Sequence, residues 1–268
     1  MRQFAKVAQA FRPGNEAQAA RATAKLHNYP MTDTRKHRGP HPEDRQLFSE
    51  DQLPALRAAA SELSWLLTRQ YALKGALKLV GDKFSLTERQ RLAVSRAACS
   101  DKSKAGRQAT QLPLDSLRDR PAIVDGFNLI ITVEAALSGG LLLLCRDGCI
   151  RDLSSVHGSY RSVNETESAV IMVGEILDQI GITDVLWILD KPISNSGRLA
   201  QRIRELAAAS EWKWRVELAF NPDAEIISSA CTAISSDGPL LDRVVRWTNL
   251  GRYLIDKRLA ESWLIDLS

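Results

Sequence analysis

The chain has 268 residues, which gives room for one large domain or two smaller ones, and its 44% hydrophobic and 25% charged residues are ordinary for a soluble globular protein. Four cysteines in a chain of this length exclude a disulfide scaffold, and their spacing fits no common zinc pattern, so we expect reduced thiols. The net charge of +4 hides an asymmetry. Residues 1–120 carry 22 Lys and Arg against 12 Asp and Glu, a net +10, and residues 121–268 carry 14 against 20, a net −6. The basic first half either attracts a polyanion or is a solvated, arginine-rich helical surface.

No stretch of the sequence indicates a membrane segment. Residues 1–30 lack the apolar core of a secretory signal. The apolar run 129–145 is interrupted by Glu134 and by Gly139-Gly140, which leaves it too broken to span a bilayer. We therefore expect a cytoplasmic protein with no membrane partner.

Residues 1–45 are predicted to form a weakly structured basic arm. Its loop 34–42 is fixed by two prolines and carries His37 and His41. These histidines belong either to a metal site or to a polar surface. The second interpretation is favoured, because two histidines supply too few ligands for a site.

Residues 46–100 are predicted to form a small all-α domain. Leucines at helical spacing indicate a first helix over 52–68, and a second over 72–81 ends at a glycine. A third helix begins at Thr87, with Gln90 as the partner in a capping box. Three short helices fit a helix-turn-helix or a bundle that packs on the second domain. We favour the bundle, because no base-reading residues stand out.

The polar segment 101–120 is expected to be a linker, and 121–268 to be the second domain. This domain opens on Ala122-Ile-Val-Asp125, a short buried strand between a proline and an Asp-Gly pair. Gly126 is expected to allow a sharp turn, and Asn128 follows on the rim. Ligands bind at the carboxyl ends of strands in an open α/β sheet, which makes Asp125 a candidate site residue.

Between this strand and the next strong one, the sequence predicts a helix, a hairpin, a loop and a second helix. The loop carries His157, an isolated candidate for a catalytic base. The predicted segments are a helix over 129–137, strands over 141–145 and 149–152 joined at Asp147-Gly148, a loop over 156–161, and a helix capped by Asn164 or Thr166.

The strongest strand signal is the apolar run 184–190, which ends on Asp190 and fits a parallel strand covered on both faces. Lys191-Pro192 breaks the run, and a helix follows. The free N–H groups at the start of that helix favour an anion, and Arg202 lies one turn further on. The alternative is ordinary capping by Ser194 or Asn195. The candidate phosphate-binding residues are Ser194, Asn195, Ser196, Gly197 and Arg198.

The last third of the chain continues the alternation of strands and helices. Residues 214–220 alternate as a strand, and 221–223 close it. A short strand from Cys231 ends at Asp237, and Asp242 follows five residues later in a helical turn. A strand over 244–249 and a helix from Tyr253 complete the domain.

Three predicted strands thus end in aspartate, at Asp125, Asp190 and Asp237, with helices between them as parallel pairing requires. Converging carboxylates repel each other, and uncompensated buried charge is costly. A hard divalent cation removes that cost, and oxygen ligands suit Mg²⁺ or Mn²⁺. Such a site binds phosphates and activates water. The alternative is that each aspartate only caps a turn.

The segments Ile123-Val-Asp-Gly-Phe-Asn128 and Ile234-Ser-Ser-Asp-Gly-Pro-Leu-Leu-Asp242, with Asp190 between them, resemble the PIN-like nuclease superfamily, including its NYN branch. The resemblance implies a three-layer α/β/α fold with a mainly parallel sheet and a Mg²⁺- or Mn²⁺-dependent nuclease site that acts mostly on RNA. It implies that Asp125, Asp190 and Asp237 are catalytic metal ligands, supported by Asn128 and Asp242. PIN domains often carry a further acid soon after the first strand, where this chain has Asn128 and then Glu134.

The whole arrangement also resembles a prokaryotic family in which a helical domain precedes such a domain. Segments 38–44, 79–84, 89–91 and 195–198 carry this second resemblance. We therefore predict a divalent-metal-dependent nuclease that hydrolyses phosphodiesters of single-stranded or structured RNA. The alternatives are a non-catalytic RNA-binding or complex-assembly protein that keeps a PIN-like fold, and a metal-dependent phosphatase. The sequence is also compatible with a homo-oligomer.

Overall fold

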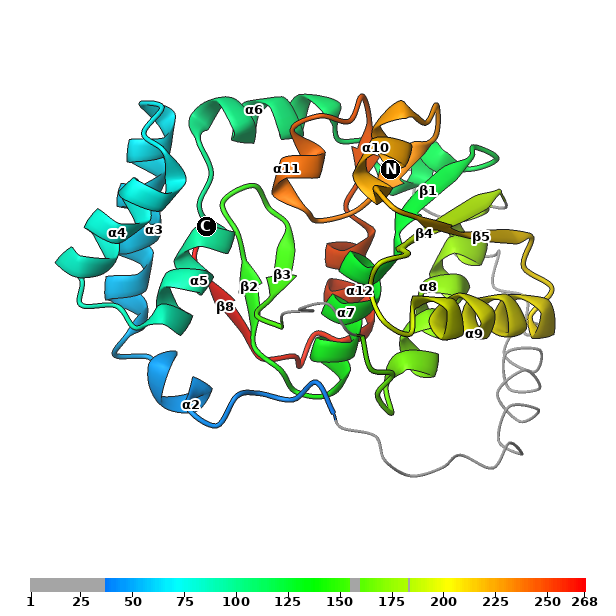
Figure 1. The fold of residues 1–268 in the computed structure, drawn as a ribbon, viewed down its shortest axis with the longest axis horizontal. Helices are drawn as coiled ribbons and strands as arrows, with labels where there is room; N and C mark the ends of the chain where they lie inside the picture. The colour runs from blue at the N-terminus through cyan, green and yellow to red at the C-terminus, as the bar shows by residue number, and fades with distance from the viewer. Residues whose placement is uncertain (1–36, 155–159, 183) are drawn as a thin grey trace, which may run out of the picture.

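The computed structural model describes residues 37–154, 160–182 and 184–268, and Figure 1 shows its fold. Most of the expected basic arm and the candidate base His157 lie outside the described residues. The described chain places a group of helices at one end of the molecule and a parallel sheet at the other, with a small second sheet between them (Figure 1).

The helical region begins with the predicted helices. Its elements are α2 (Asp44–Leu47), α3 (Leu53–Thr68), α4 (Leu73–Lys83) and α5 (Glu88–Ala97). The capping box of α5 is confirmed: the Thr87 hydroxyl accepts from the N–H of Gln90, and the Gln90 side chain accepts from the N–H of Thr87. Gly81 does not end α4, which runs two residues further. A Cβ at Gly81 would meet the Arg91 guanidinium, so this glycine allows helix contact instead of a stop.

The segment expected to be a linker is mostly helical. It contains α6 (Asp101–Thr110), which Ser100 caps by accepting from the N–H of Ser103, and the 3-10 turn η1 (Leu114–Leu117). Arg107 of α6 and Leu117 of η1 are both buried. The polar composition suggested a linker because it does not reveal that Arg107 is buried within ion pairs.

The main sheet has five parallel strands in the order β5-β4-β1-β6-β7. The strands are β1 (Ala122–Asp125), β4 (Val185–Asp190), β5 (Trp214–Ala219), β6 (Thr232–Ile234) and β7 (Trp247–Thr248). The register pairs Asp125 with Ile188 and Asp190 with Ala219. The carboxyl ends of β1, β4 and β5 therefore lie at the same edge of the sheet.

Helices cover both faces of this sheet, which agrees with the expected α/β/α layering. One face packs through Val124, Trp187 and Val216, and the other through Ile123 and Ile188. The first face is covered by α7 (Gly126–Leu137), α8 (Thr166–Ile180), α9 (Ser196–Ala209) and α12 (Leu250–Arg258), and the second by α10 (Pro222–Ser228) and α11 (Gly238–Leu241).

Gly126 has a different role from the predicted sharp turn. Helix α7 begins at Gly126 directly after β1. A Cβ on this residue would lie 2.9 Å from the backbone oxygen of Ile188 and 2.6 Å from the Leu189 side chain. The glycine is therefore required because the start of α7 passes close to β4.

A second, three-stranded sheet has the order β3-β2-β8. Its strands are β2 (Leu142–Leu144), β3 (Ile150–Asp152) and β8 (Leu264–Asp266). The antiparallel pairing of β2 with β3 confirms the predicted hairpin, and β8 pairs parallel with β2. The sequence predicted a closing helix from Tyr253 onward, whereas α12 starts at Leu250 and is followed by β8.

The helical region packs on this second sheet, as the bundle interpretation expected. Leu56, Leu63 and Val94 share one core with Leu143 of β2 and Ile265 of β8. Figure 1 shows α5 beside β2 and β8. The helical region and the second sheet are therefore parts of one hydrophobic core.

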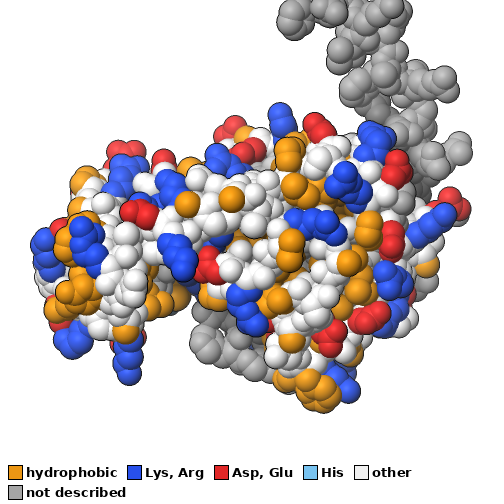
Figure 2. Space-filling model, turned by 90° about the horizontal axis from the view of Figure 1, so that it is seen from above, with side chains coloured by type: hydrophobic (Ala, Val, Ile, Leu, Met, Phe, Trp, Pro, Cys, Tyr) orange, Lys and Arg blue, Asp and Glu red, His pale blue; other side chains and the backbone are white. Residues whose placement is uncertain are grey.

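The face that Figure 2 shows does not concentrate positive charge at the helical end. Figure 2 shows Lys and Arg side chains spread along the length of one face, with acidic and apolar side chains between them. Several cations of the helical region are paired with acids, as in Lys83 with Glu62 and Arg91 with Asp82. No helix among the described residues is long and apolar enough to cross a membrane.

Candidate functional site

Four aspartates follow strands at the carboxyl edge of the main sheet. Asp125 and Asp190 end β1 and β4, and Asp237 lies three residues beyond β6, where it caps α11. The fourth is Asp223, in the first turn of α10 and four residues beyond β5. Sequence reasoning placed Asp223 in a strand-closing turn and missed its role, although it follows a strand just as Asp237 does. We refer to these four residues as the strand-end carboxylates.

The negative charges of the strand-end carboxylates raise the pKa values of their neighbours in this group. The pKa of Asp125 is raised to about 7, first by burial and then by the negative charges of Asp237, Asp190 and Asp223, against a hydrogen bond from Ser235 that lowers it. Burial also raises the pKa of Asp190 and of Asp223, and each gains a further increase from a neighbouring strand-end carboxylate. The three aspartates predicted from the sequence therefore influence one another.

In the described part of the chain, none of the strand-end carboxylates forms an ion pair, although the positive charge of Arg243 offsets part of the rise in the pKa of Asp223. By contrast, the buried carboxylates of Asp44, Glu134 and Asp147 each pair with an arginine. The negative charge at this edge of the main sheet is therefore only partly compensated by cations of the protein.

Oxygen donors of this kind suit a hard divalent cation. However, no three Asp, Glu, His or Cys side chains are close enough together to hold a metal ion within residues 37–154, 160–182 and 184–268. Like charge keeps carboxylates apart when no cation is bound. The donor chemistry therefore fits a cation, while the side chains are not gathered around one point.

Two serines after β6 and Asn128 hold this edge together. The Ser235 hydroxyl donates to Oδ2 of Asp125 at 2.8 Å and accepts from the N–H of Asp237 at 3.0 Å. Oδ1 of Asn128 accepts from the N–H of Ser236 at 2.8 Å and from its hydroxyl at 2.9 Å. Asn128, predicted as a supporting residue on the rim, therefore positions the loop that carries Asp237.

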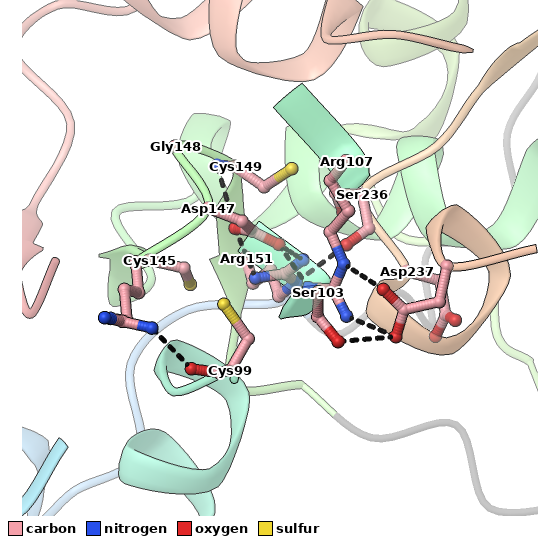
Figure 3. Close-up of polar contacts among 12 residues, drawn as sticks. Cys99, Ser103, Arg107, Cys145, Asp147, Gly148, Cys149, Arg151, Ser236 and Asp237 are labelled. Atoms are coloured by element: carbon pink, nitrogen blue, oxygen red, sulfur yellow. Dashed lines mark hydrogen bonds and ion pairs between the residues drawn. The ribbon is translucent and has the colours of Figure 1, made fainter. Parts of the chain in front are cut away.

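A neighbouring polar network supports the same loop (Figure 3). Arg107 of α6 and Arg151 of β3 each donate to Asp147 at 2.6 Å, and Nε of Arg151 donates to the carbonyl of Ser236 at 2.7 Å. Burial alone would raise the pKa of Asp147, but the two guanidinium groups outweigh it and hold the pKa at about 2. Arg107 also binds Asp242, at 2.8 Å. Asp242, expected to support the carboxylates, therefore belongs to this network.

The start of α9 leaves backbone N–H groups uncapped, as phosphate binding requires, but not all of the side chains expected there are available. No side chain caps α9, so neither Ser194 nor Asn195 plays the expected capping role. Asn195 adopts a left-handed conformation at φ 68° and donates to the carbonyl of Tyr160 at 2.8 Å. Ser196 is buried, and Gly197 and Arg198 are exposed. Free N–H groups of the first turn remain available to an anion.

Arg202 does not serve this helix start. Its guanidinium pairs with Glu167 at 2.7 Å and with Glu205 at 3.1 Å. These two carboxylates neutralise the arginine, so Arg198 is the exposed cation left near the first turn of α9.

Glu134 and His37 contact residues away from the strand ends. Glu134 is buried and accepts from Arg38, from the hydroxyl of Tyr160 at 2.5 Å and from that of Thr166 at 2.5 Å. Thr166 is therefore used inside α8 and does not cap it. His37 pairs with Glu165 at 2.6 Å, which favours the polar-surface interpretation of the histidine loop.

The fold and this edge define an α/β protein with a parallel five-stranded sheet and a carboxylate-rich strand edge. Residues 114–253, more than half of the chain, match the family described as a domain of unknown function, DUF5616, and the chain belongs to that family. Residues 55–109 match a second family, described as a protein of unknown function, DUF434. The two matches meet inside the segment 101–120 that the sequence marked as a boundary.

One relative extends over most of the chain. An uncharacterized protein of Methanocaldococcus jannaschii, MJ0935, is 29% identical over 202 residues, which cover 75% of this chain and 94% of the relative. No solved structure matches the chain significantly. The descriptions of both families and of this relative name no activity.

Proposed function

We propose that the protein is a divalent-metal-dependent nuclease that hydrolyses RNA phosphodiesters at the edge formed by the strand-end carboxylates. One observation carries the proposal. Four aspartates, each at or just beyond the end of a different parallel strand, lie at one edge without an ion pair among the described residues, while the buried acids Asp44, Glu134 and Asp147 each have an arginine. Concentrated carboxylates without a cation are costly unless a ligand compensates them.

Asp125, Asp190 and Asp237 would hold Mg²⁺ or Mn²⁺, with Asp223 as a fourth oxygen donor nearby. When bound, such a cation activates water and draws negative charge from the phosphate. Ser235 orients Asp125 through its 2.8 Å hydrogen bond, and Asn128 fixes the loop that presents Asp237. Asn128 is therefore a positioning residue.

The phosphate itself would be held at the start of α9. The uncapped first turn offers backbone N–H groups, and the exposed Arg198 adds a positive charge. Gly197 keeps the approach open, because a Cβ there would meet nothing within 4 Å. Ser194, Asn195 and Ser196 shape this turn through backbone and side-chain bonds to Tyr160 and Lys191.

The test is a cleavage assay with single-stranded RNA, single-stranded DNA and a phosphomonoester, each with Mn²⁺ and with EDTA. The wild type should cleave RNA with Mn²⁺ only. Asp125→Asn should lower the rate by at least about 100-fold, because losing one metal-site donor removes several kcal/mol of charge stabilisation. Circular dichroism checks that the variant is folded.

Asp178→Asn is the matched control, since Asp178 is an exposed carboxylate in α8, and it should keep full activity. Wild-type cleavage by Asp125→Asn would contradict the proposed site. Turnover of the phosphomonoester alone would favour the phosphatase alternative, and RNA binding without any turnover would favour the non-catalytic alternative.

A further inference from the structure

One exposed aromatic side chain lies at the carboxylate edge. Phe220 directly follows β5 and is 76% exposed, the largest exposed fraction of any aromatic residue in the described chain. This exposure leaves most of the apolar surface of the phenyl ring in water, which is unfavourable. A ring in this state is able to accept a flat partner.

Phe220 is paired with a cation from the neighbouring strand. The register places Asp190 opposite Ala219, and the next residue, Lys191, donates its N–H to the carbonyl of Ala219 at 2.8 Å. The Lys191 ammonium lies 4.6 Å from the centroid of the Phe220 ring. The ring and the ammonium are therefore held together directly beyond β4 and β5.

This pair lies next to the strand-end carboxylates. Neighbouring strands are about 4.8 Å apart and rise about 3.3 Å per residue, so the Cα atoms of Phe220 and Asp190 are separated by about 6 Å. Asp223 follows Phe220 by three residues at the start of α10. A nucleotide bound at the carboxylates would thus have its neighbour within reach of the ring.

We propose that Phe220 and Lys191 form a stacking platform for an unpaired base of a single-stranded nucleic acid. This inference rests on the proposed function and specifies that the substrate is single-stranded. The base would stack on the phenyl face opposite the ammonium, and the ammonium would attract the adjacent phosphate. A base inside a duplex has no free face, so the platform selects single strands.

The surroundings favour a base over a protein partner. Lys191 lies over the ring, and Asn221 follows Phe220 directly in the chain; both of these polar residues are exposed. Protein interfaces need a larger continuous apolar patch. Proteins that bind single strands stack bases on aromatic side chains and contact the phosphates with cations, and a single ring with a cation beside it provides both kinds of contact.

The experiment measures binding of a fluorescein-labelled single-stranded RNA by anisotropy in EDTA at low salt. Phe220→Ala and Phe220→Leu should both bind about tenfold more weakly, because each loses one stacked base. Phe220→Trp should bind as well as the wild type or more tightly, and should show tryptophan quenching beyond that of the wild type. Tyr71→Ala is the control, because Tyr71 is 54% exposed in the helical region, and its binding should not change.

Binding in EDTA separates this proposal from the catalytic one, since no turnover is required. Equal affinity of Phe220→Ala and wild type would overturn the platform even if the protein cleaves RNA. If the Leu, Ala and Trp variants of Phe220 all bind equally weakly, stacking is not the cause of binding. If these variants keep wild-type affinity but change their oligomeric state on gel filtration, the platform is also wrong. Wild-type protein that binds RNA through Phe220 but never cleaves it would leave the platform standing and refute the nuclease.

Discussion

At the scale of a single residue, the site raises the pKa of Asp125. Its pKa is about 7, because of burial and the charges of Asp237, Asp190 and Asp223. An unfolded aspartate loses its proton near pH 4. The folded protein therefore holds a proton that the unfolded chain has released between about pH 4 and pH 7, so the free energy of unfolding falls as the pH rises through this window.

Asp125→Asn should remove this pH dependence. Asparagine is nearly isosteric, keeps an oxygen that accepts from Ser235, and carries no charge. Without added metal, we expect the variant to be more stable than the wild type by about 1–2 kcal/mol at pH 8, a value reduced from the full linkage for partial exposure of the site. At pH 5 the difference should be about one third of that value, because only the first unit of the window between about pH 4 and pH 7 has then been crossed.

Urea unfolding in EDTA at pH 5 and pH 8 measures this difference, with Asp178→Asn as the control. A variant less stable than the wild type at pH 8 would mean that Asp125 acts as a hydrogen-bonding, structural aspartate. Most point mutants destabilise, so a gain in stability is a specific sign of relieved repulsion.

At the scale of elements, the unit formed by β1 and α7 places Asp125. The strand ends at Asp125 and the helix starts at the next residue, so the position of α7 sets the direction of the carboxylate. Close approach of α7 to β4 depends on the missing side chain of Gly126.

Gly126→Ala should therefore destabilise the protein by about 1–3 kcal/mol, the usual cost of overpacking a tight contact. Gly75→Ala in α4 is the control: a Cβ there meets nothing within 4 Å, and alanine should stabilise the helix by up to about 1 kcal/mol. Chemical denaturation of both variants gives the comparison. A Gly126→Ala variant as stable as the wild type would show that α7 and β4 are not in such close contact.

The sequence predicted the elements whose signal is local. Apolar runs marked β1 and β4, and helical spacing with a capping box marked α3 and α5. It missed features that depend on distant partners. Arg107 made α6 look like part of a polar linker, because its acids Asp147 and Asp242 are far away in the chain.

The candidate site followed the same rule. Strand-end position predicted Asp125, Asp190 and Asp237, since each ends or closely follows its own strand. Asp223 carried the same local signal as Asp237, since it closely follows a strand, and was missed. The contact of Asn128 with Ser236 could not be assigned from local sequence, because it depends on which strands become neighbours in the sheet. The alternative that Ser194 or Asn195 caps α9 was wrong, since no side chain caps this helix and the Asn195 side chain donates to the carbonyl of Tyr160 instead.

At the scale of the whole molecule, contacts through the second sheet link the helical region to the carboxylate edge. The helices share a core with the second sheet, and Arg107 and Arg151 connect α6 and β3 to the loop that carries Asp237. Many cations of the first half are bound within the protein, so charge asymmetry alone does not make it an RNA-binding surface. The helical region therefore packs on the second sheet, and Arg151 of that sheet contacts the loop that carries Asp237.

The central claim is that the strand-end carboxylates hold one divalent cation, and thermal melts with EDTA and with Mn²⁺ test it most directly. At free Mn²⁺ ten times the dissociation constant, the gain in stability should be about 1.4 kcal/mol, which for a chain of this size raises the melting temperature by roughly 3–6 °C. Wild type and Asp178→Asn should show this shift, and Asp125→Asn and Asp237→Asn should lose most of it. Equal shifts in all four proteins, or none in the wild type, would contradict the account.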